Sequence, residues 1–93
     1  MNTEQEILQL NDAYHSFWYC YRNKNANIKL HEKIIIDSKN PYYCYMFARY
    51  IKNSNKELIS KAILLSQDLY YIKAFYDNIN FNKSKYQTLM LFL

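Results

Sequence analysis

The chain matches itself when residues 29–56 are placed over residues 57–84, with eight identities and no gap. The matched pairs are Leu30/Leu58, Lys33/Lys61, Ile35/Ile63, Ser38/Ser66, Tyr42/Tyr70, Tyr43/Tyr71, Phe47/Phe75 and Ile51/Ile79. We call the shift that carries Leu30 onto Leu58 the repeat offset. Because the identities keep one register and include apolar and aromatic positions, the offset predicts structural units that stack on one another.

The same offset predicts how the whole chain is organised. We expect a single domain, 1–93. Residues 1–28 form a degenerate leading unit, 29–56 and 57–84 are the two good units, and 85–93 make a trailing half-unit. The atypical units at both ends are typical of repeat arrays, since an end unit has a neighbour on one side only.

Composition and apolar spacing predict a helical fold. The chain has no Gly and one Pro, which argues against tight β-hairpins and leaves Asn for turns with positive φ. Apolar residues recur at steps of three and four, so we expect helices over 4–22, 29–38, 41–52, 56–66, 69–78 and 83–93. In the first of these the expected buried stripe is Ile7, Leu10, Tyr14, Phe17 and Tyr21, and the second is expected to bury Leu30, Ile34 and Ile35. The predicted fold class is all-α, with short helical-pair repeats stacked into a small solenoid-like bundle of about six helices. Strands at 34–36 and 42–45 are the less favoured alternative, because β-branched and aromatic residues also suit sheets.

One stretch resembles a known repeat type. Residues 40–51, Asn-Pro-Tyr-Tyr-Cys-Tyr-Met-Phe-Ala-Arg-Tyr-Ile, follow Leu30, Ile34, Ile35 and Ser38, and residues 25–28 read Asn-Ala-Asn-Ile. This pattern is similar to the tandem α-helical repeats, of matching length, in giant-virus, phage and some bacterial proteins. The resemblance covers 25–51 best and 57–79 less well, where Phe75-Tyr76 replaces the family's Phe-Ala. It implies a scaffold or binding surface and brings no catalytic residues.

Eleven tyrosines are the strongest compositional bias. Tyrosine is enriched at protein interfaces, yet the in-register residues Tyr14, Tyr42, Tyr43, Tyr70 and Tyr71 are expected to pack between helices with their hydroxyls at the edge. The tyrosines outside the repeat identities are better candidates for recognition. The predicted partner-binding residues are Tyr21, Tyr45, Tyr50, Tyr76 and Arg49.

The repeat offset also aligns lysines. Lys24, Lys29, Lys33, Lys52, Lys56 and Lys61 are predicted to form a ridge for nucleic acid or an acidic partner. Acidic Glu32, Asp37, Glu57 and Asp68 interrupt this field, and a solvated face is the alternative. The net charge of +4 comes with an Asn- and Lys-rich composition, so it also fits the codon bias of an AT-rich genome.

Few residues suggest chemistry. His15 and His31 lack partners at metal-ligand spacing, and no serine has an evident His–carboxylate setting, so we expect no metal, no cofactor and no enzyme activity. Cys20 and Cys44 are expected to be small buried hydrophobic residues, with a disulfide or a metal pair as the alternative. No apolar run is long enough for a transmembrane helix, and the first residues do not resemble a signal peptide, so we expect a cytoplasmic protein without a membrane span.

Three functions therefore compete. The leading hypothesis is a protein-binding module, in its specific form a phage or mobile-element inhibitor of a host defence complex that acts in the host cytoplasm. A small basic nucleic-acid-binding protein is the second. The third is a self-assembling structural protein whose homo-oligomer forms through the C-terminal half-unit, at Leu89, Met90, Phe92 and Leu93.

Overall fold

The computed structural model describes residues 3–79, and that part of the chain is entirely helical. Its six helices are α1 Glu4–Leu10, α2 Ala13–Arg22, α3 Ile28–Asp37, α4 Pro41–Tyr50, α5 Lys56–Ser66 and α6 Leu69–Asn78. The all-α prediction is confirmed for these residues, and the strand alternative is wrong. The predicted helix over 83–93 and the self-association residues Leu89, Met90, Phe92 and Leu93 lie outside the described residues.

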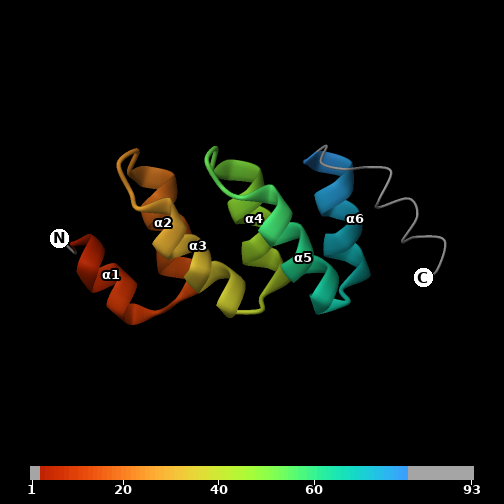
Figure 1. Cartoon of the computed structure of the whole chain (residues 1–93), viewed down its shortest axis with the longest axis horizontal. Helices are drawn as coiled ribbons and strands as arrows, with labels where there is room; N and C mark the ends of the chain where they lie inside the picture. Colours follow the sequence, from red (N-terminus) through yellow and green to blue (C-terminus); the bar gives the residue numbers. More distant parts are fainter. Residues whose placement is uncertain (1–2, 80–93) are drawn as a thin grey trace.

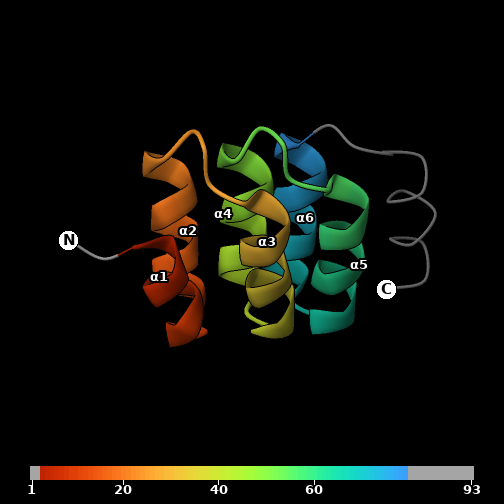
Figure 2. The same ribbon diagram turned by 60° about the vertical axis from the view of Figure 1, so that its left-hand side comes forward.

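The helices form two layers (Figures 1 and 2). Helices α2, α4 and α6 pack side by side in one layer, and α1, α3 and α5 cover one side of it. The molecule is elongated, with extents of 47 × 20 × 16 Å. The core lies between the layers, where Ile35, Phe47, Ile59, Ile63 and Phe75 are all fully buried.

The helix boundaries recur at the spacing seen in the sequence. Helices α2, α4 and α6 begin at Ala13, Pro41 and Leu69, and α3 and α5 begin at Ile28 and Lys56; the repeat offset relates the neighbours in each set. Polar residues cap the starts of α3, α4, α5 and α6: the side chains of Asn27, Asn40, Asn55 and Asp68 each accept a hydrogen bond from a backbone N–H of the first turn. Pro41 occupies the first position of α4, where its missing N–H has no intrahelical partner to lose.

The predicted first helix is wrong as a single element. The chain breaks between α1 and α2, where Asn11 adopts the left-handed conformation with φ 50° and ψ 47°. Asn tolerates this conformation better than other residues with a side chain. Two further residues have positive φ, Lys39 at 57° and Gln67 at 59°, so the expectation that Asn alone supplies such turns is also wrong. The repeat offset again relates these three positions to one another.

The break reorients the expected buried stripe. Ile7 and Phe17 are buried as predicted, whereas Leu10, Tyr14 and Tyr21 are about half exposed. Leu30 on α3, also expected to face inward, is exposed as well. A helix that contacts the core along one side buries only part of a wide apolar stripe, and the flanking positions remain at the surface. Several large apolar side chains are therefore left on the outside.

Candidate binding surface

Tyr21 and Tyr50, two of the predicted partner-binding residues, lie next to each other on the surface. Tyr21 lies in the last turn of α2 and Tyr50 ends α4, and their ring centroids are 6.2 Å apart with the planes at 80°. The side chains are 55% and 46% exposed, respectively. The sequence predicts this proximity only indirectly, since the repeat offset relates Tyr50 to Arg22 rather than to Tyr21. The packing of α2 against α4 brings the two rings together.

Arg49, which was also predicted to bind a partner, lies against two aromatic rings. Its guanidinium carbon lies 5.4 Å from the centroid of the Tyr50 ring and 5.8 Å from that of Tyr45. Its Nη1 also donates a hydrogen bond to the Tyr45 hydroxyl, at 2.6 Å. Cation–π contacts of this kind hold the guanidinium group in position and leave its positive charge in place. Among residues 3–79, the ion pairs involve His15, His31 and Lys33, and neither arginine of the chain takes part in one.

Tyr45 and Tyr76 were predicted to be surface residues, and the structure contradicts this. Tyr45 is only 7% exposed, because the repeat offset makes it the equivalent of core residue Phe17, on the inward side of its helix. Tyr76 is 1% exposed and packs edge-on against Phe75, with 4.9 Å between ring centroids. It occupies the place that Ala48 takes in α4, and Ala48 is itself buried. The repeat offset makes the two positions equivalent, but the sequence does not show that either one is buried.

Trp18 and Arg22 belong to the same surface, although neither was among the residues predicted to bind a partner. Trp18 lies 5.6 Å from Tyr21, ring to ring, and the Arg22 guanidinium carbon lies 5.3 Å from the centroid of the Trp18 indole. On α2, Tyr21 and Arg22 follow Trp18 by three and four positions, which is the signal that places them on one side of the helix. Hot spots of protein interfaces are enriched in these three residue types.

Two predicted ridge lysines border this surface. Lys24 and Lys52 line the same hollow as Tyr21 and Tyr50, of about 460 Å³, and no acidic residue lines it. Its lining residues lie at the C-terminal ends of α2 and α4 and in the links to α3 and α5. We define the aromatic–basic patch as Trp18, Tyr21, Arg22, Lys24, Arg49, Tyr50 and Lys52.

The remaining ridge lysines lie elsewhere, so the structure does not bring the predicted ridge together. Lys29 and Lys33 line a hollow beside α3, and Lys61 lines another between α3 and α5. Lys56 donates to the carbonyl of Ile51 and to the Ser54 hydroxyl, at 3.3 and 2.5 Å. Burial lowers the pKa of Lys56, opposed in part by the nearby Glu32 carboxylate. Lys56 therefore stabilises the link before α5.

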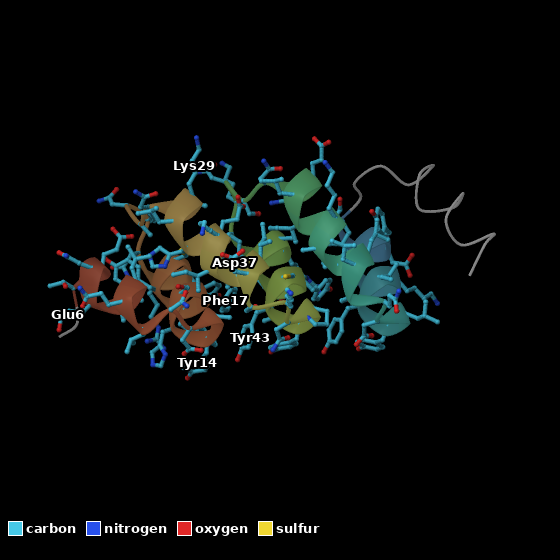
Figure 3. The ribbon with its side chains drawn as sticks, turned by 60° about the horizontal axis from the view of Figure 1, so that its bottom comes forward. Glu6, Tyr14, Phe17, Lys29, Asp37 and Tyr43 are labelled. Carbon is cyan, nitrogen blue, oxygen red and sulfur yellow. The ribbon has the colours of Figure 1, made fainter. Side chains whose placement is uncertain are left out.

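The in-register tyrosines form a row along one edge, in which Tyr43 and Tyr71 are partly buried against the core, as predicted. Tyr14, Tyr42 and Tyr70 are exposed near the starts of α2, α4 and α6, which contradicts the prediction that they pack inside. The ring centroids of Tyr14 and Tyr43 are 6.5 Å apart, and those of Tyr42 and Tyr71 are 6.0 Å apart. Each of these ring contacts joins neighbouring helices. Figure 3 shows Tyr14 and Tyr43 near each other along this edge.

Two tyrosines of the row, Tyr43 and Tyr71, have a raised pKa. Burial raises the pKa of Tyr43, as do neighbouring Tyr42, Asp12 and Tyr14. Burial likewise raises the pKa of Tyr71, with smaller contributions from Tyr70, Asp68 and Tyr42. The row joins the aromatic–basic patch through Tyr14 and Trp18, whose ring centroids are 6.5 Å apart.

A serine, a histidine and a glutamate are hydrogen-bonded in series, which the sequence analysis did not foresee. The Ser16 hydroxyl lies 2.9 Å from His31 Nδ1, and His31 Nε2 lies 2.9 Å from Glu4 Oε2. The order is that of a hydrolytic triad, but Ser16 and His31 are both fully buried, and His31 stacks on Tyr19. A nucleophile needs access to its substrate. These two hydrogen bonds therefore connect α1, α2 and α3.

The cysteines behave as predicted. Cys20 and Cys44 are both free and buried. Burial, with help from the charges of Glu4 and Glu32, raises the pKa of Cys20 to about 12, and burial alone raises that of Cys44 to about 11. Thiols in this state are unreactive. Within residues 3–79, no three His, Cys, Asp or Glu side chains come close enough together to bind a metal ion.

The chain has no match among models of protein families, curated proteins or solved structures. Within residues 3–79, no helix combines the length and apolar character needed to cross a bilayer.

Proposed function

We propose that this chain is a non-enzymatic helical-repeat module that binds another protein through the aromatic–basic patch. The observation that carries the proposal is the exposed pair of Tyr21 and Tyr50, flanked by arginines that rest on aromatic rings. Aromatic side chains give a large contact area at a small cost in conformational entropy, and arginine adds directed hydrogen bonds. Because the patch carries four cations and its hollow is lined by no acidic residue, the preferred partner surface is acidic.

The stacking of repeat units is part of the same proposal. It is supported by one hydrogen bond that recurs at equivalent positions. Glu4 Oε2 accepts from the backbone N–H of Asn27 at 2.7 Å, and Glu32 Oε2 accepts from that of Asn55 at 2.5 Å. Each bond joins a helix of the covering layer to the cap of the next one. A solenoid built in this way presents an elongated surface, which suits protein binding.

The turns between paired helices support it as well. The hydroxyl of Ser38 donates to the carbonyl of Ile35 and accepts from the N–H of Asn40. Ser66 makes the equivalent two bonds with Ile63 and Asp68, and the matching distances are the same. Both turns also contain a residue with positive φ. The shared turn geometry favours the same crossing in both helix pairs.

The biological setting is proposed from the resemblance to phage and giant-virus repeats. A small basic chain of this type is suited to occupy an acidic site on a host protein complex and to block it. In that role the protein acts in the cytoplasm of the host, and inhibition of a defence complex is the specific form we propose.

The test uses the chain of residues 1–93 and a matched tyrosine control. Protein carrying Tyr21→Ala and Tyr50→Ala and protein carrying Tyr70→Ala are each used to capture components from host extract, with quantitative mass spectrometry. Tyr70 is 73% exposed and lies outside the patch, so it reports the effect of removing any surface tyrosine. We expect a component that wild type and Tyr70→Ala retain and the double variant loses. Equal capture by all three proteins refutes the patch as the binding site, provided that circular dichroism shows equal helicity.

Nucleic-acid binding is the second candidate, because aromatic rings and cations also occur together in single-strand binding sites. The geometry of the patch favours protein. Tyr21 and Tyr50 are nearly perpendicular, and guanidinium groups lie over the rings of Trp18 and Tyr50, where a base would stack. A titration of labelled single- and double-stranded oligonucleotides distinguishes the two: binding that weakens steeply with salt supports nucleic acid, and no binding at low salt excludes it.

A further inference from the structure

A groove runs between α3 and α5 in the covering layer, apart from the tyrosine pair. Two adjoining hollows, of about 760 and 750 Å³, share Ile36, Asp37 and Leu58 as lining residues. Apolar side chains make much of the lining: besides Leu58, which is 46% exposed, Ala62 and Leu65 contribute from α5. Leu65 is 83% exposed. An exposed apolar strip between two helices is typical of grooves that accept a third helix.

The charged residues of the groove are mainly lysines. Lys29, Lys33, Lys39 and Lys61 line the two hollows, together with Glu32 and Asp37. Lys29 extends away from the helices in Figure 3, on the same helix as Asp37. The carboxylates are already engaged. Glu32 accepts from Asn55 and is nearly buried, and Asp37 pairs with Lys33 at 3.3 Å. Three lysines of the groove therefore have no carboxylate partner among residues 3–79.

We propose that this groove binds an amphipathic helix whose polar side is acidic, supplied by a partner protein. The apolar lining takes the leucine-like side chains of such a helix, and Lys29, Lys39 and Lys61 pair with its carboxylates. Helix α5 has 11 residues, so the bound helix has about three turns in contact, at roughly 1.5 Å per residue. The groove is separate from the aromatic rings of the patch, although Ile28 and Asn53 line both the groove and the hollow beneath Tyr21 and Tyr50.

Charge argues against two other occupants. Residues 80–93 carry Lys83 and Lys85 and no acidic side chain, so this segment brings positive charge to a lysine-rich groove. A second copy of the chain has a net charge of +4 and meets the same repulsion. An amphipathic acidic helix can cover the apolar lining and also provide carboxylates for the unpaired lysines.

The test uses a fluorescein-labelled synthetic peptide of about 14 residues, with Leu at i, i+3, i+4 and i+7 spacing and Glu elsewhere. The matched peptide has Lys in place of every Glu. Binding to the chain of residues 1–93 is measured by fluorescence anisotropy. We expect the acidic peptide to bind wild type, the basic peptide not to bind, and Lys61→Glu or Leu58→Ser to weaken the acidic peptide about tenfold.

The controls separate this groove from the patch. Leu30 is exposed on α3 but does not line the groove, so Leu30→Ser is expected to leave the affinity unchanged. Equal affinity for both peptides overturns the proposal, as does binding that Tyr21→Ala abolishes and Leu58→Ser leaves intact. A peptide of residues 80–93 that displaces the probe assigns the groove to the chain's own segment. If sedimentation shows a dimer that Leu58→Ser dissociates, the groove binds a second copy of the chain. Either result, displacement by the peptide or such a dimer, also overturns the proposal.

Discussion

Glu32 is the most informative residue to perturb, because a single buried carboxylate joins two helices. Its Oε2 accepts a hydrogen bond of 2.5 Å from the backbone N–H of Asn55, and the residue is 6% exposed. A hydrogen bond to a charged group contributes about 1.5–3 kcal/mol, and removing the carboxylate also relieves part of its cost of burial. We expect Glu32→Ala to lower the free energy of unfolding by about 2 kcal/mol, or roughly 10 °C in Tm.

Two variants provide the comparison. Glu32→Gln keeps an acceptor oxygen but loses the charge, so we expect a loss of about 1 kcal/mol. Glu57, an exposed acid in the first turn of α5, makes only a helix-dipole contribution, and Glu57→Ala is expected to cost about 0.5 kcal/mol. Urea denaturation followed by circular dichroism at 222 nm measures all three. If Glu32→Ala matches the wild type, or if Glu32→Gln is the more harmful change, the bond does not tie the units together.

Three further predictions concern the buried residues. Tyr76→Ala should lower the free energy of unfolding by about 3 kcal/mol in urea denaturation, since it empties a core position, and an unchanged midpoint would contradict that. In the folded protein, Cys20 and Cys44 should resist iodoacetamide up to about pH 9, because their raised pKa values keep them as thiols. Both should react in denaturant, and fast labelling of the folded protein would show that they are accessible. A fluorophosphonate probe should not label Ser16, despite its bond to His31, and labelling that Ser16→Ala abolishes would reveal a hydrolytic site.

Helix positions could be predicted well where local chemistry decides them. Asn40 and Pro41 mark the start of α4, and Asn55 marks that of α5, as the cap and the proline require. The break after α1 also has a local cause, since Asn11 and Asp12 are both poor helix formers, but the apolar spacing across them concealed it. The apolar spacing predicts one continuous helix, whereas the two turn residues favour a break, and the structure has the break.

Surface residues were harder to predict because burial depends on which helices meet. Tyr14 and Tyr42 repeat in register and yet are exposed, whereas Tyr45 and Tyr76, outside the repeat identities, are buried. Repetition shows that positions are equivalent and does not show whether they face the core.

Long-range polar contacts were beyond reach from the sequence. Glu4 meets His31 and Asn27 only because α1 packs against α3, and no spacing in the sequence signals that contact. The grouping of Trp18 and Arg22 with Arg49 and Tyr50 likewise depends on how α2 packs on α4. The sequence therefore indicated five residues of the patch and missed two, Trp18 and Arg22, which belong to it through contacts with neighbouring rings.

Site-specific photo-crosslinking in host cells tests the proposed binding surface most directly. A benzophenone amino acid is placed at Tyr50, inside the aromatic–basic patch, or at Tyr70, which is exposed outside it. We expect a discrete protein adduct from position 50 after illumination, abolished by Tyr21→Ala, and none from position 70. The same adduct from both positions, or none from position 50 in folded protein, would contradict binding at the patch.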